Sequence, residues 1–307
     1  MNPRVTVVGS LNMDLIALSP RIPQPGETII GKRFHTAPGG KGANQAVAAA
    51  NLGAQVFMVG SVGEDAFADS LLENLASAGV DHKFVTRDQK NATGVALIVV
   101  DDHGENSIVV ASGANMHLEP ADLEFAEDTI ASSDVLLLQL EVPLEVVIRA
   151  AEMAQAHQVT VVLNPAPARA LPDELLRLID FLIPNETETA LLSGKPARSQ
   201  EEIQVAAESL RDLGVGNVIL TLGERGALLT GATKSQLYPA FKVNPVDTTA
   251  AGDAFMGAFA VALGEGKSIP DAIRFGNAAG ALATTRLGAQ PSLPTRAEVE
   301  TLIRNNN

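Results

Sequence analysis

The segment Asp247–Phe255, DTTAAGDAF, places a turn of small residues between two carboxylates and directly ahead of an apolar run. A helix that begins in such a turn points unpaired backbone N–H groups and the positive end of its dipole outward, as an anion site requires. Asp253, in the first helical turn, could take a proton from an attacking hydroxyl while the amides stabilise a phosphoryl group. A helix-capping aspartate is the alternative, and this segment alone does not separate the two interpretations.

A second candidate is the glycine-rich segment Gly39–Gln45, GGKGANQ, which leads into a helical pattern over residues 43–52. Its glycines permit close approach of the backbone to a ligand. Lys41 offers a cation, and Asn44 offers both a donor and acceptors. This chemistry suits a polyhydroxylated ligand, although a glycine-rich turn alone is weak support for a site.

Carboxylates follow two of the strands that we predict. Asp14 comes shortly after the first strand, in Asn12-Met13-Asp14, and Glu141 follows the strand at 135–140. Each carboxylate has two acceptor oxygens, which suit a pair of vicinal hydroxyls. In isolation, either residue is more simply interpreted as a solvated surface charge.

Asn185-Glu186-Thr187-Glu188 begins after another predicted strand, at 181–183. Side-chain oxygens of this kind suit Mg²⁺, which usually binds through waters and substrate phosphates. Helix capping is an equally good interpretation of Asn185 and Glu186. The sequence leaves both open.

Two near matches to a P-loop fail. Gly26–Arg33 ends in Arg where Ser or Thr belongs, and Gly264–Ser268 has Val261 at the position of the first glycine. Neither joins a strand to a helix as the motif requires. The turn Gly9–Asn12 after the first strand lacks the dinucleotide fingerprint, so a nicotinamide oxidoreductase is a poor candidate.

The elements that must position these groups alternate along the chain. Short apolar runs predict strands, and the longer segments between them have a helical period. This rhythm predicts an α/β fold of three layers, a doubly wound, mostly parallel central sheet flanked by helices. Ligands bind outside the carboxyl ends of the strands in such sheets. The predicted strands are 4–8, 55–59, 135–140, 160–163, 181–183 and 217–221, and the helices include 43–52, 66–78, 143–156, 201–213 and 253–263.

Two segments depart from this rhythm. Residues 14–36 contain three prolines and the extended pieces Leu15–Leu18 and Thr28–Ile30, while residues 93–112 have the pattern of a hairpin. We expect both to form a small β-sheet lid beside the ligand cleft. Edge strands that extend the main sheet are the alternative. With no linker in the sequence, residues 1–307 are predicted to form one domain that carries this lid.

The charge and composition exclude several classes of partner. The net charge is −14, which disfavours nucleic acid and anionic membrane surfaces. There is no cysteine, so thiolate metal sites and cysteine nucleophiles are excluded. The amino terminus lacks the pattern of a secretory signal and no apolar run is long enough to span a membrane, so we expect a cytoplasmic protein.

Taken together, the motifs resemble those of the ribokinase-like carbohydrate kinases. Gly39–Gln45 and Asp247–Asp253 resemble the two signatures of that family. The resemblance extends over essentially the whole chain and includes Asn12–Asp14, Gln139–Glu141, Asn164–Ala168, Pro184–Glu188, Thr221–Gly226 and Gly288–Ser292. As a set these motifs are specific, although each alone is not.

The resemblance implies phosphorylation of D-ribose at its 5-hydroxyl by ATP, with Asp253 as general base. The amides of Ala250, Ala251, Gly252 and Asp253 would form the anion hole. The implied sugar-binding residues are Asn12, Asp14, Gly40, Lys41, Gly42, Asn44, Glu141 and Asp253. The implied nucleotide-binding residues are Asn185, Thr221, Gly223, Gly226, Gly252 and Asn277.

The resemblance also implies cofactors and assembly. Glu188 would organise Mg²⁺ through water, and a monovalent cation, K⁺, would lie beside the anion hole. The implied cation residues are Asp247, Thr249, Ala283, Arg286, Gly288 and Ser292. The lid would also form the interface of a homodimer. One departure is Ala250, where many relatives have glycine, because alanine tolerates a positive φ less readily.

Several alternatives remain at this stage. The first is a kinase for another small sugar, 2-deoxyribose above all, because Asp14 is most useful when both the 2- and 3-hydroxyls are present. A nucleoside kinase would need aromatic or apolar room for a base, and only 4% of the residues are aromatic. A catalytically silent sugar sensor on the same fold would have no need of Asp253 as a base.

Overall fold

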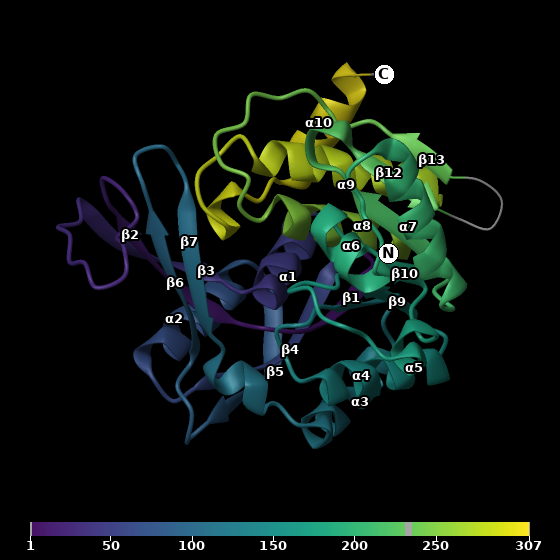
Figure 1. The fold of residues 1–307 in the computed structure, drawn as a ribbon. Helices are drawn as coiled ribbons and strands as arrows, with labels where there is room; N and C mark the ends of the chain where they lie inside the picture. The colour runs from purple at the N-terminus through teal and green to yellow at the C-terminus, as the bar shows by residue number, and fades with distance from the viewer. Residues whose placement is uncertain (1, 231–234, 307) are drawn as a thin grey trace.

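The protein is described here by a computed structural model that covers residues 2–230 and 235–306. In this part of the chain, nine strands form one twisted sheet (Figure 1). All neighbouring strands are parallel except at one edge, where β12 and β13 are antiparallel. The spatial order is β13 (Ser235–Tyr238), β12 (Ala227–Thr230), β11 (Asn217–Thr221), β10 (Phe181–Leu182), β9 (Thr160–Leu163), β8 (Val135–Leu138), β1 (Arg4–Val8), β4 (Gln55–Gly63) and β5 (Val80–Asp88).

The central strands are apolar on both faces, and this pattern produces the three predicted layers. Val135 and Leu137 of β8 pack with the helices on one face, whereas Leu136 and Leu138 pack with those on the other. The alternation is the two-residue period of a strand. Because both faces are covered, the strands read as continuous hydrophobic runs.

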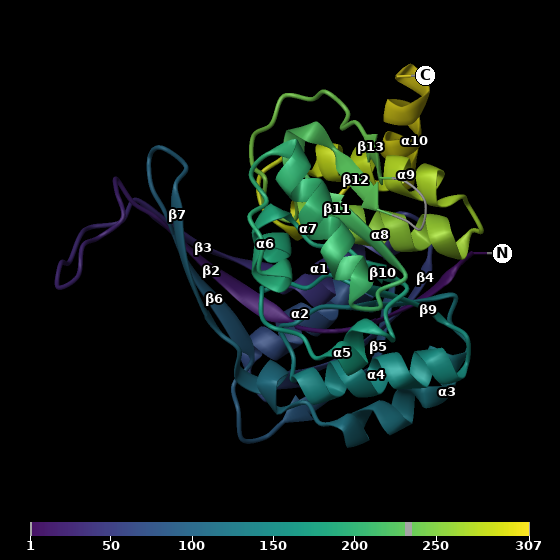
Figure 2. The same cartoon turned by 45° about the vertical axis from the view of Figure 1, so that its right-hand side comes forward.

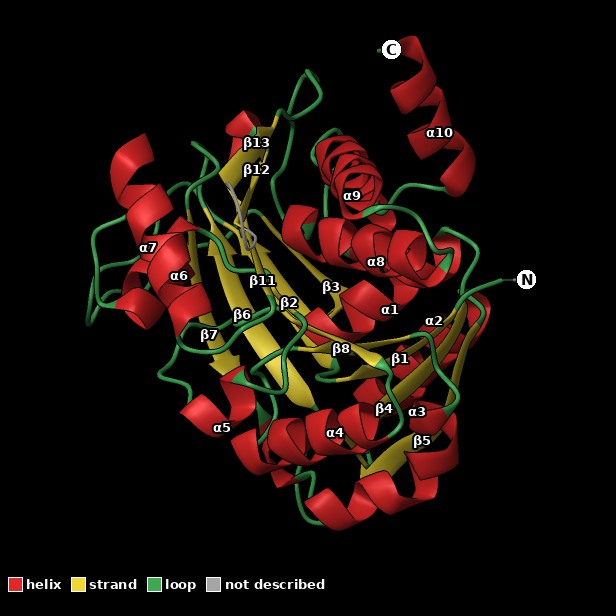
Figure 3. Cartoon of the chain, turned by 90° about the vertical axis from the view of Figure 1, so that its right-hand side faces the viewer, coloured by secondary structure: helices red, strands yellow, loops and turns green. Residues whose placement is uncertain are grey.

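Helices cover both faces of the sheet (Figure 3). One layer contains α1 (Lys41–Asn51), α2 (Ala66–Ser77), α8 (Ala251–Gly264), α9 (Ile269–Ala283) and α10 (Arg296–Asn305). The other contains α3 (Glu127–Ala131), α4 (Leu144–Ala156), α5 (Asp173–Leu176), α6 (Glu186–Ser193) and α7 (Gln200–Asp212). Short 3₁₀ turns lie at Gly113–His117, Pro120–Ala126, Gly223–Arg225 and Gln290–Ser292. In the described ranges, no helix has the length and apolar character of a membrane span.

The strand order reverses beside β1. The chain passes from β1 outward to β4 and β5, then returns to β8 on the other side of β1 and continues outward to β11. In open α/β sheets, ligands bind outside the carboxyl ends of the strands at such a switch point. The segments after β1 and β8, which contain Ser10 and Glu141, therefore flank the expected ligand crevice.

A second sheet stands apart from the first and projects from the body of the molecule (Figures 1 and 2). Its order is β3 (Arg33–Gly39), β2 (Asn12–Leu18), β6 (Gly94–Val100) and β7 (Asn106–Ala111). Residues 14–36 and 93–112, predicted to form a small β-sheet, thus contribute the strands of a separate sheet, and the alternative of edge strands on the main sheet is wrong. We refer to β3, β2, β6 and β7 as the small sheet.

One local prediction in the small sheet is also wrong. Thr28–Ile30 forms no strand, and the partner of β2 is instead Arg33–Gly39. The N–H of Lys32 donates to the carbonyl of Leu18 at 2.7 Å, which closes the connecting loop and starts the pairing one residue later. Ile30 lies in the loop with 86% of its surface exposed.

Candidate active site

The turn ahead of α8 adopts the conformation that an anion site needs. Ala250 caps the helix with φ 57°, in the left-handed region, and its side chain makes no capping hydrogen bond. This conformation costs energy for alanine and indicates a constraint at the site. A side chain built on Gly252 would meet nothing within 4 Å, so the start of the helix faces open space. The N–H of Ala251 donates to the carbonyl of Thr248 at 3.3 Å, and the N–H groups that follow it in the first turn are left to bind a ligand there.

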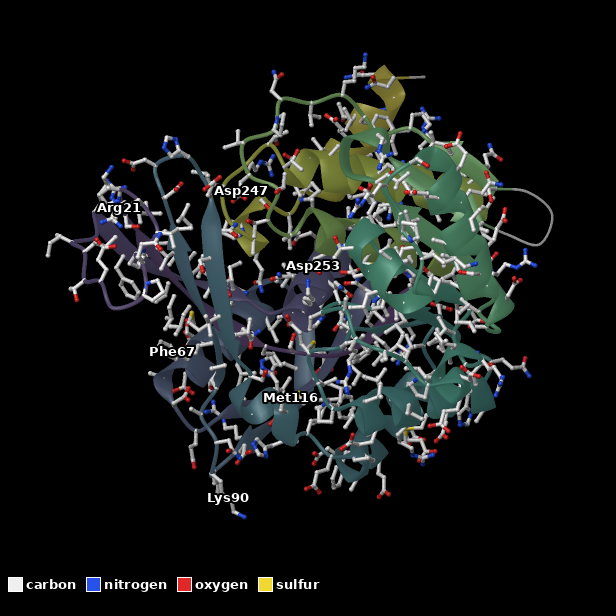
Figure 4. All side chains as sticks on the ribbon, viewed as in Figure 1. Arg21, Phe67, Lys90, Met116, Asp247 and Asp253 are labelled. Carbon is white, nitrogen blue, oxygen red and sulfur yellow. The ribbon has the colours of Figure 1, made fainter. Side chains whose placement is uncertain are left out.

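Asp253 is the third residue of α8, so it is not the N-cap. Its side chain is 7% exposed and is held by two amides of α1. Asn44 Nδ2 donates to Asp253 Oδ2 at 2.9 Å, and Gln45 Nε2 donates to Asp253 Oδ1 at 3.0 Å. Figure 4 shows Asp253 near the middle of the view, with Arg21 far out on the loop of the small sheet. This burial and clamping suit a base rather than a solvated helix cap.

Lys41 is the first residue of α1, and its ammonium lies in an acidic surrounding. Burial acts to lower the pKa of Lys41, but the charges of Asp253, Glu141 and Glu188 outweigh it and raise the pKa above its ordinary value. Lys41 is therefore a permanent cation at neutral pH. It would face the negative charge that gathers at this point during a transfer of phosphate.

Asp14 lies on β2 of the small sheet, next to the main body. Its pKa is raised to about 6, first by burial and then by the charges of Glu141 and Asp253. A side chain on Gly39 would come within 2.5 Å of both Asp14 carboxylate oxygens, so the glycine makes room for the carboxylate. The carboxylate is thus placed by the strand register of Asp14 against Ala37 and Ala96.

Glu141 joins the turn after β1 to the start of α1. Its Oε2 accepts hydrogen bonds from the hydroxyl of Ser10 and from the N–H of Lys41, the latter at 3.1 Å. The N–H of Gly42 in turn donates to Ser10 Oγ at 3.3 Å. Glu141 therefore fixes the glycine-rich turn and still has acceptor capacity at Oε1 for a ligand.

The glycine-rich turn packs tightly on the backbone after β1. Gly40 has φ 89°, and a side chain on it would lie 2.7 Å from the N–H nitrogen of Asn12. Only glycine fits this combination of dihedral angle and contact. The side chain of Asn12 is 3% exposed, and its Oδ1 accepts from Asn115 Nδ2 at 2.8 Å. Asn12, the first residue of β2, is thus held in place at the end of the small sheet.

Asn185 and Glu188 are joined in a capping box at the start of α6. Asn185 N and Nδ2 donate to the two carboxylate oxygens of Glu188 at 2.8 and 3.0 Å. Burial raises the pKa of Glu188, against the opposing effects of this hydrogen bond and of Lys41. The capping interpretation is therefore confirmed for Asn185 but not for Glu186, which pairs with Arg225 while Glu188 completes the capping box. The β-bridge from Asn185 to Thr221 places Thr221 beside this box.

Two more predicted nucleotide residues contact the chain after β13. Asn277 on α9 donates from Nδ2 to the carbonyls of Tyr238 and Pro239 at 3.0 and 3.2 Å. A side chain on Gly226 would lie 2.0 Å from the Tyr238 carbonyl oxygen. Gly223 opens the 3₁₀ turn after β11 with φ 55° and has open space before it.

The predicted cation residues gather at the end of α9. Asp247 Oδ1 accepts from Thr249 N and Oγ1 at 2.9 and 2.6 Å, and Oδ2 accepts from Gly288 N at 2.9 Å. Burial acts to raise the pKa of Asp247, but these hydrogen bonds outweigh it and lower the pKa below its ordinary value.

The other predicted cation residues follow one another between Ala283 and Ser292, and the polar side chains of Arg286 and Ser292 make other contacts. Ala283 ends α9, Arg286 pairs with Glu298, and Ser292 Oγ donates to the carbonyl of Ala289 at 2.7 Å. Among the described residues, no three carboxylates and histidines form a cluster that could hold a metal ion by themselves.

Sequence reasoning assigned no role to three polar residues that build the site: Ser10, Gln45 and Gln139. Each is completely buried. The sequence offers one signal for two of them, a polar residue beside or inside an apolar run: Gln139 in LLLQL and Gln45 in NQAVAAA. A buried polar group must find a hydrogen-bond partner, so such positions deserve scrutiny.

The chain is similar to known proteins over nearly its whole length. The model of the pfkB family carbohydrate kinases matches residues 2–296. Ribokinase of Haemophilus influenzae is 46% identical over 298 residues, 97% of either chain. Deoxyribokinase of Salmonella typhi is 41% identical over 292 residues, 95% of either chain. The structure of Arabidopsis thaliana ribokinase complexed with ribose and ATP matches with a TM-score of 0.92, at 38% identity and 99% coverage of both chains.

Proposed function

The chain belongs to the pfkB family of carbohydrate kinases, and from that premise we propose that it transfers the γ-phosphoryl group of ATP to the 5-hydroxyl of D-ribose. The observation that carries the proposal is the buried carboxylate of Asp253 at the start of α8, held by two side-chain amides of α1. Asp14, Glu141 and Lys41 surround it with the acceptors and the cation that a sugar and a phosphate need. Products are D-ribose 5-phosphate and ADP.

The reaction follows from these positions. Asp253 accepts the proton of the sugar hydroxyl, whose oxygen then forms a bond to the γ-phosphorus while the bond from that phosphorus to the β-bridging oxygen breaks. The N–H groups at the start of α8 stabilise the charge on the transferred group. Lys41 adds a fixed positive charge on the same side.

Mg²⁺ would neutralise the phosphates of ATP in this reaction. Glu188 suits an indirect role, because Asn185 uses one lone pair of each carboxylate oxygen and leaves others for metal-bound water. Asn185, Thr221, Gly223, Gly226, Gly252 and Asn277 would border the nucleotide. We also propose a cytoplasmic location, since the reaction consumes ATP.

We propose that the small sheet is the lid of this site. It carries Asp14 on β2, so its position determines whether a sugar hydroxyl can reach that carboxylate. Asp253 lies on α8 and its two amide donors lie on α1, and both helices belong to the body. A lid separate from the base can admit the sugar and then exclude water from the transfer.

The experiment that tests the function is ATP consumption across a panel of pentoses, hexoses and nucleosides. D-Ribose should give the highest kcat/KM. The similarity to deoxyribokinase makes 2-deoxyribose the strongest competitor. A preference for a hexose or a nucleoside of more than an order of magnitude would overturn the assignment.

A monovalent cation should activate the enzyme. The carboxylate of Asp247, the hydroxyl of Thr249 and the carbonyls at the end of α9, which keep a second lone pair beyond their local hydrogen bonds, form an oxygen-rich surrounding that suits K⁺, close to the turn of Ala250. We expect several-fold faster turnover in K⁺ than in tetramethylammonium at equal ionic strength. Equal rates in the two salts would remove the cation from the mechanism.

We propose that the chain forms a homodimer through the outer face of the lid. Phe34, Leu97 and Val109 share one face of the small sheet by register, opposite to Asp14. They are 65%, 48% and 62% exposed, so an apolar patch is left uncovered in one copy.

A solution mass of twice 32.0 kDa is therefore expected. Val109→Asp should reduce the mass to that of one chain. Leu237→Asp, at a residue that is 44% exposed on β13, should leave it unchanged. A monomer of the unmodified chain at high concentration would contradict the proposal.

A further inference from the structure

Gln45 lies fully buried between the proposed base, Asp253, and a second buried amide, that of Gln139. Its Nε2 donates to Asp253 Oδ1 at 3.0 Å, and its Oε1 accepts from Gln139 Nε2 at 2.6 Å. A second, longer contact joins Gln45 Nε2 to Asn164 Oδ1 at 3.4 Å. A chain of amides therefore runs from the end of β8, through α1, to the carboxylate on α8.

The direction of this chain is determined by its ends. A carboxylate only accepts hydrogen bonds, so the group of Gln45 that faces Asp253 must be the NH₂. That leaves the Gln45 oxygen toward Gln139, which must then present its own NH₂. Rotating either amide by half a turn would place two acceptors or two donors against each other.

This arrangement of amides leaves one buried polar atom without a hydrogen bond. Gln139 Oε1 is buried without a hydrogen-bond partner. A side chain on Gly9 would lie 2.0 Å from that oxygen, so Gly9 leaves the space that the amide of Gln139 occupies. Native proteins rarely leave buried polar atoms unpaired, and exceptions often accompany function.

We propose that Gln45 is a positioning residue for Asp253, and that Gln139 fixes the orientation of the Gln45 amide. This inference rests on the proposed function, in which Asp253 is the base. Gln45 holds one carboxylate oxygen while Asn44 holds the other, so the plane of the carboxylate is set before the sugar arrives. A base held in this plane takes the hydroxyl proton without first reorienting.

The test is kinetic, on the full-length enzyme. Gln45→Met keeps the volume of the side chain but removes the donor, and should lower kcat about 10- to 100-fold, the value of one hydrogen bond to a charged group. KM for the sugar should change less than threefold (a rough limit), because Asp14 and Glu141 remain. Gln155→Met is the matched control, since Gln155 also donates to a carboxylate, that of Asp180, but at the surface. It should leave kcat unchanged.

Gln139→Met tests the second link without touching Asp253. It should lower kcat by a smaller factor than Gln45→Met, with the thermal midpoint and the affinity for sugar showing that the protein is folded. It also serves if Gln45→Met proves unstable. Wild-type kcat in a folded Gln139→Met protein would exclude a role for Gln139 in orienting Gln45.

A double-mutant cycle with Asp253→Asn separates positioning from general damage. Once the base is absent, adding Gln45→Met should cost almost nothing further in kcat. An equal loss in both backgrounds would show a merely structural role and overturn the inference. If Asp253→Asn alone kept full turnover, the proposed base would fail instead, so the two failures are distinguishable.

Discussion

Asp253→Asn should lower kcat by about 10²- to 10⁴-fold, the usual contribution of a general base. The variant keeps the size of the side chain but cannot take the hydroxyl proton. The affinity for sugar and ATP should change far less, because Asp14, Glu141 and the amides at the start of α8 remain. Asn44 and Gln45 both lose a charged acceptor, and one of them then faces the new NH₂ group, so a modest fall in the thermal midpoint is expected.

The control for this variant lies on the next helix. Asp271 is the third residue of α9, the same helical position that Asp253 has in α8, but its helix is capped by Ser268. Asp271→Asn should leave kcat unchanged, which separates catalysis from helix-end electrostatics. A folded Asp253→Asn protein that binds both substrates and turns over at nearly the wild-type rate would end the assignment of Asp253 as the base.

Much of this site could be predicted because it is built from strand ends. The segments after β1 and β8 are far apart in the chain, yet the parallel sheet brings their ends to one edge. Glu141 was therefore a candidate from its place after an apolar run, although by itself it was more simply interpreted as a solvated charge. Asp253 was predictable from the small residues ahead of its helix, although only the structure shows that the helix is capped by Ala250 instead.

The rest depends on packing that no local pattern records. The direction in which Gln45 points follows from the approach of α1 to α8 and from the amide of Gln139, which follows β8. The register of β3 follows from the loop that closes at Lys32, and not from the strand propensity of Thr28–Ile30. In both places, tertiary contacts override the local preference.

The last expected result concerns Asp14 and the identity of the sugar. Asp14→Asn should lower kcat/KM for D-ribose by about 10²-fold, because hydrogen bonds to a charged group are worth more than those to a neutral one. The loss for 2-deoxyribose should be smaller, since that sugar lacks one of the hydroxyls that the carboxylate can hold. Asp102→Asn, on the exposed tip of the small sheet, is the control and should preserve both values.

The raised pKa of Asp14 also predicts how kcat/KM for D-ribose depends on pH. The pKa of Asp14 is about 6, raised first by burial and then by the negative charges of Glu141 and Asp253. As the pH falls through about 6, Asp14 takes up a proton and loses acceptor capacity, so kcat/KM should decrease on the acid side. In Asp14→Asn this group cannot titrate, and the part of the decrease near pH 6 should disappear. An unchanged ratio of the two sugars, together with an unchanged pH profile, would show that Asp14 does not contact these hydroxyls. If the ratio of the two sugars changed but the pH dependence stayed, the titration would belong to a neighbouring group. Glu188 is such a group, because its pKa is also raised.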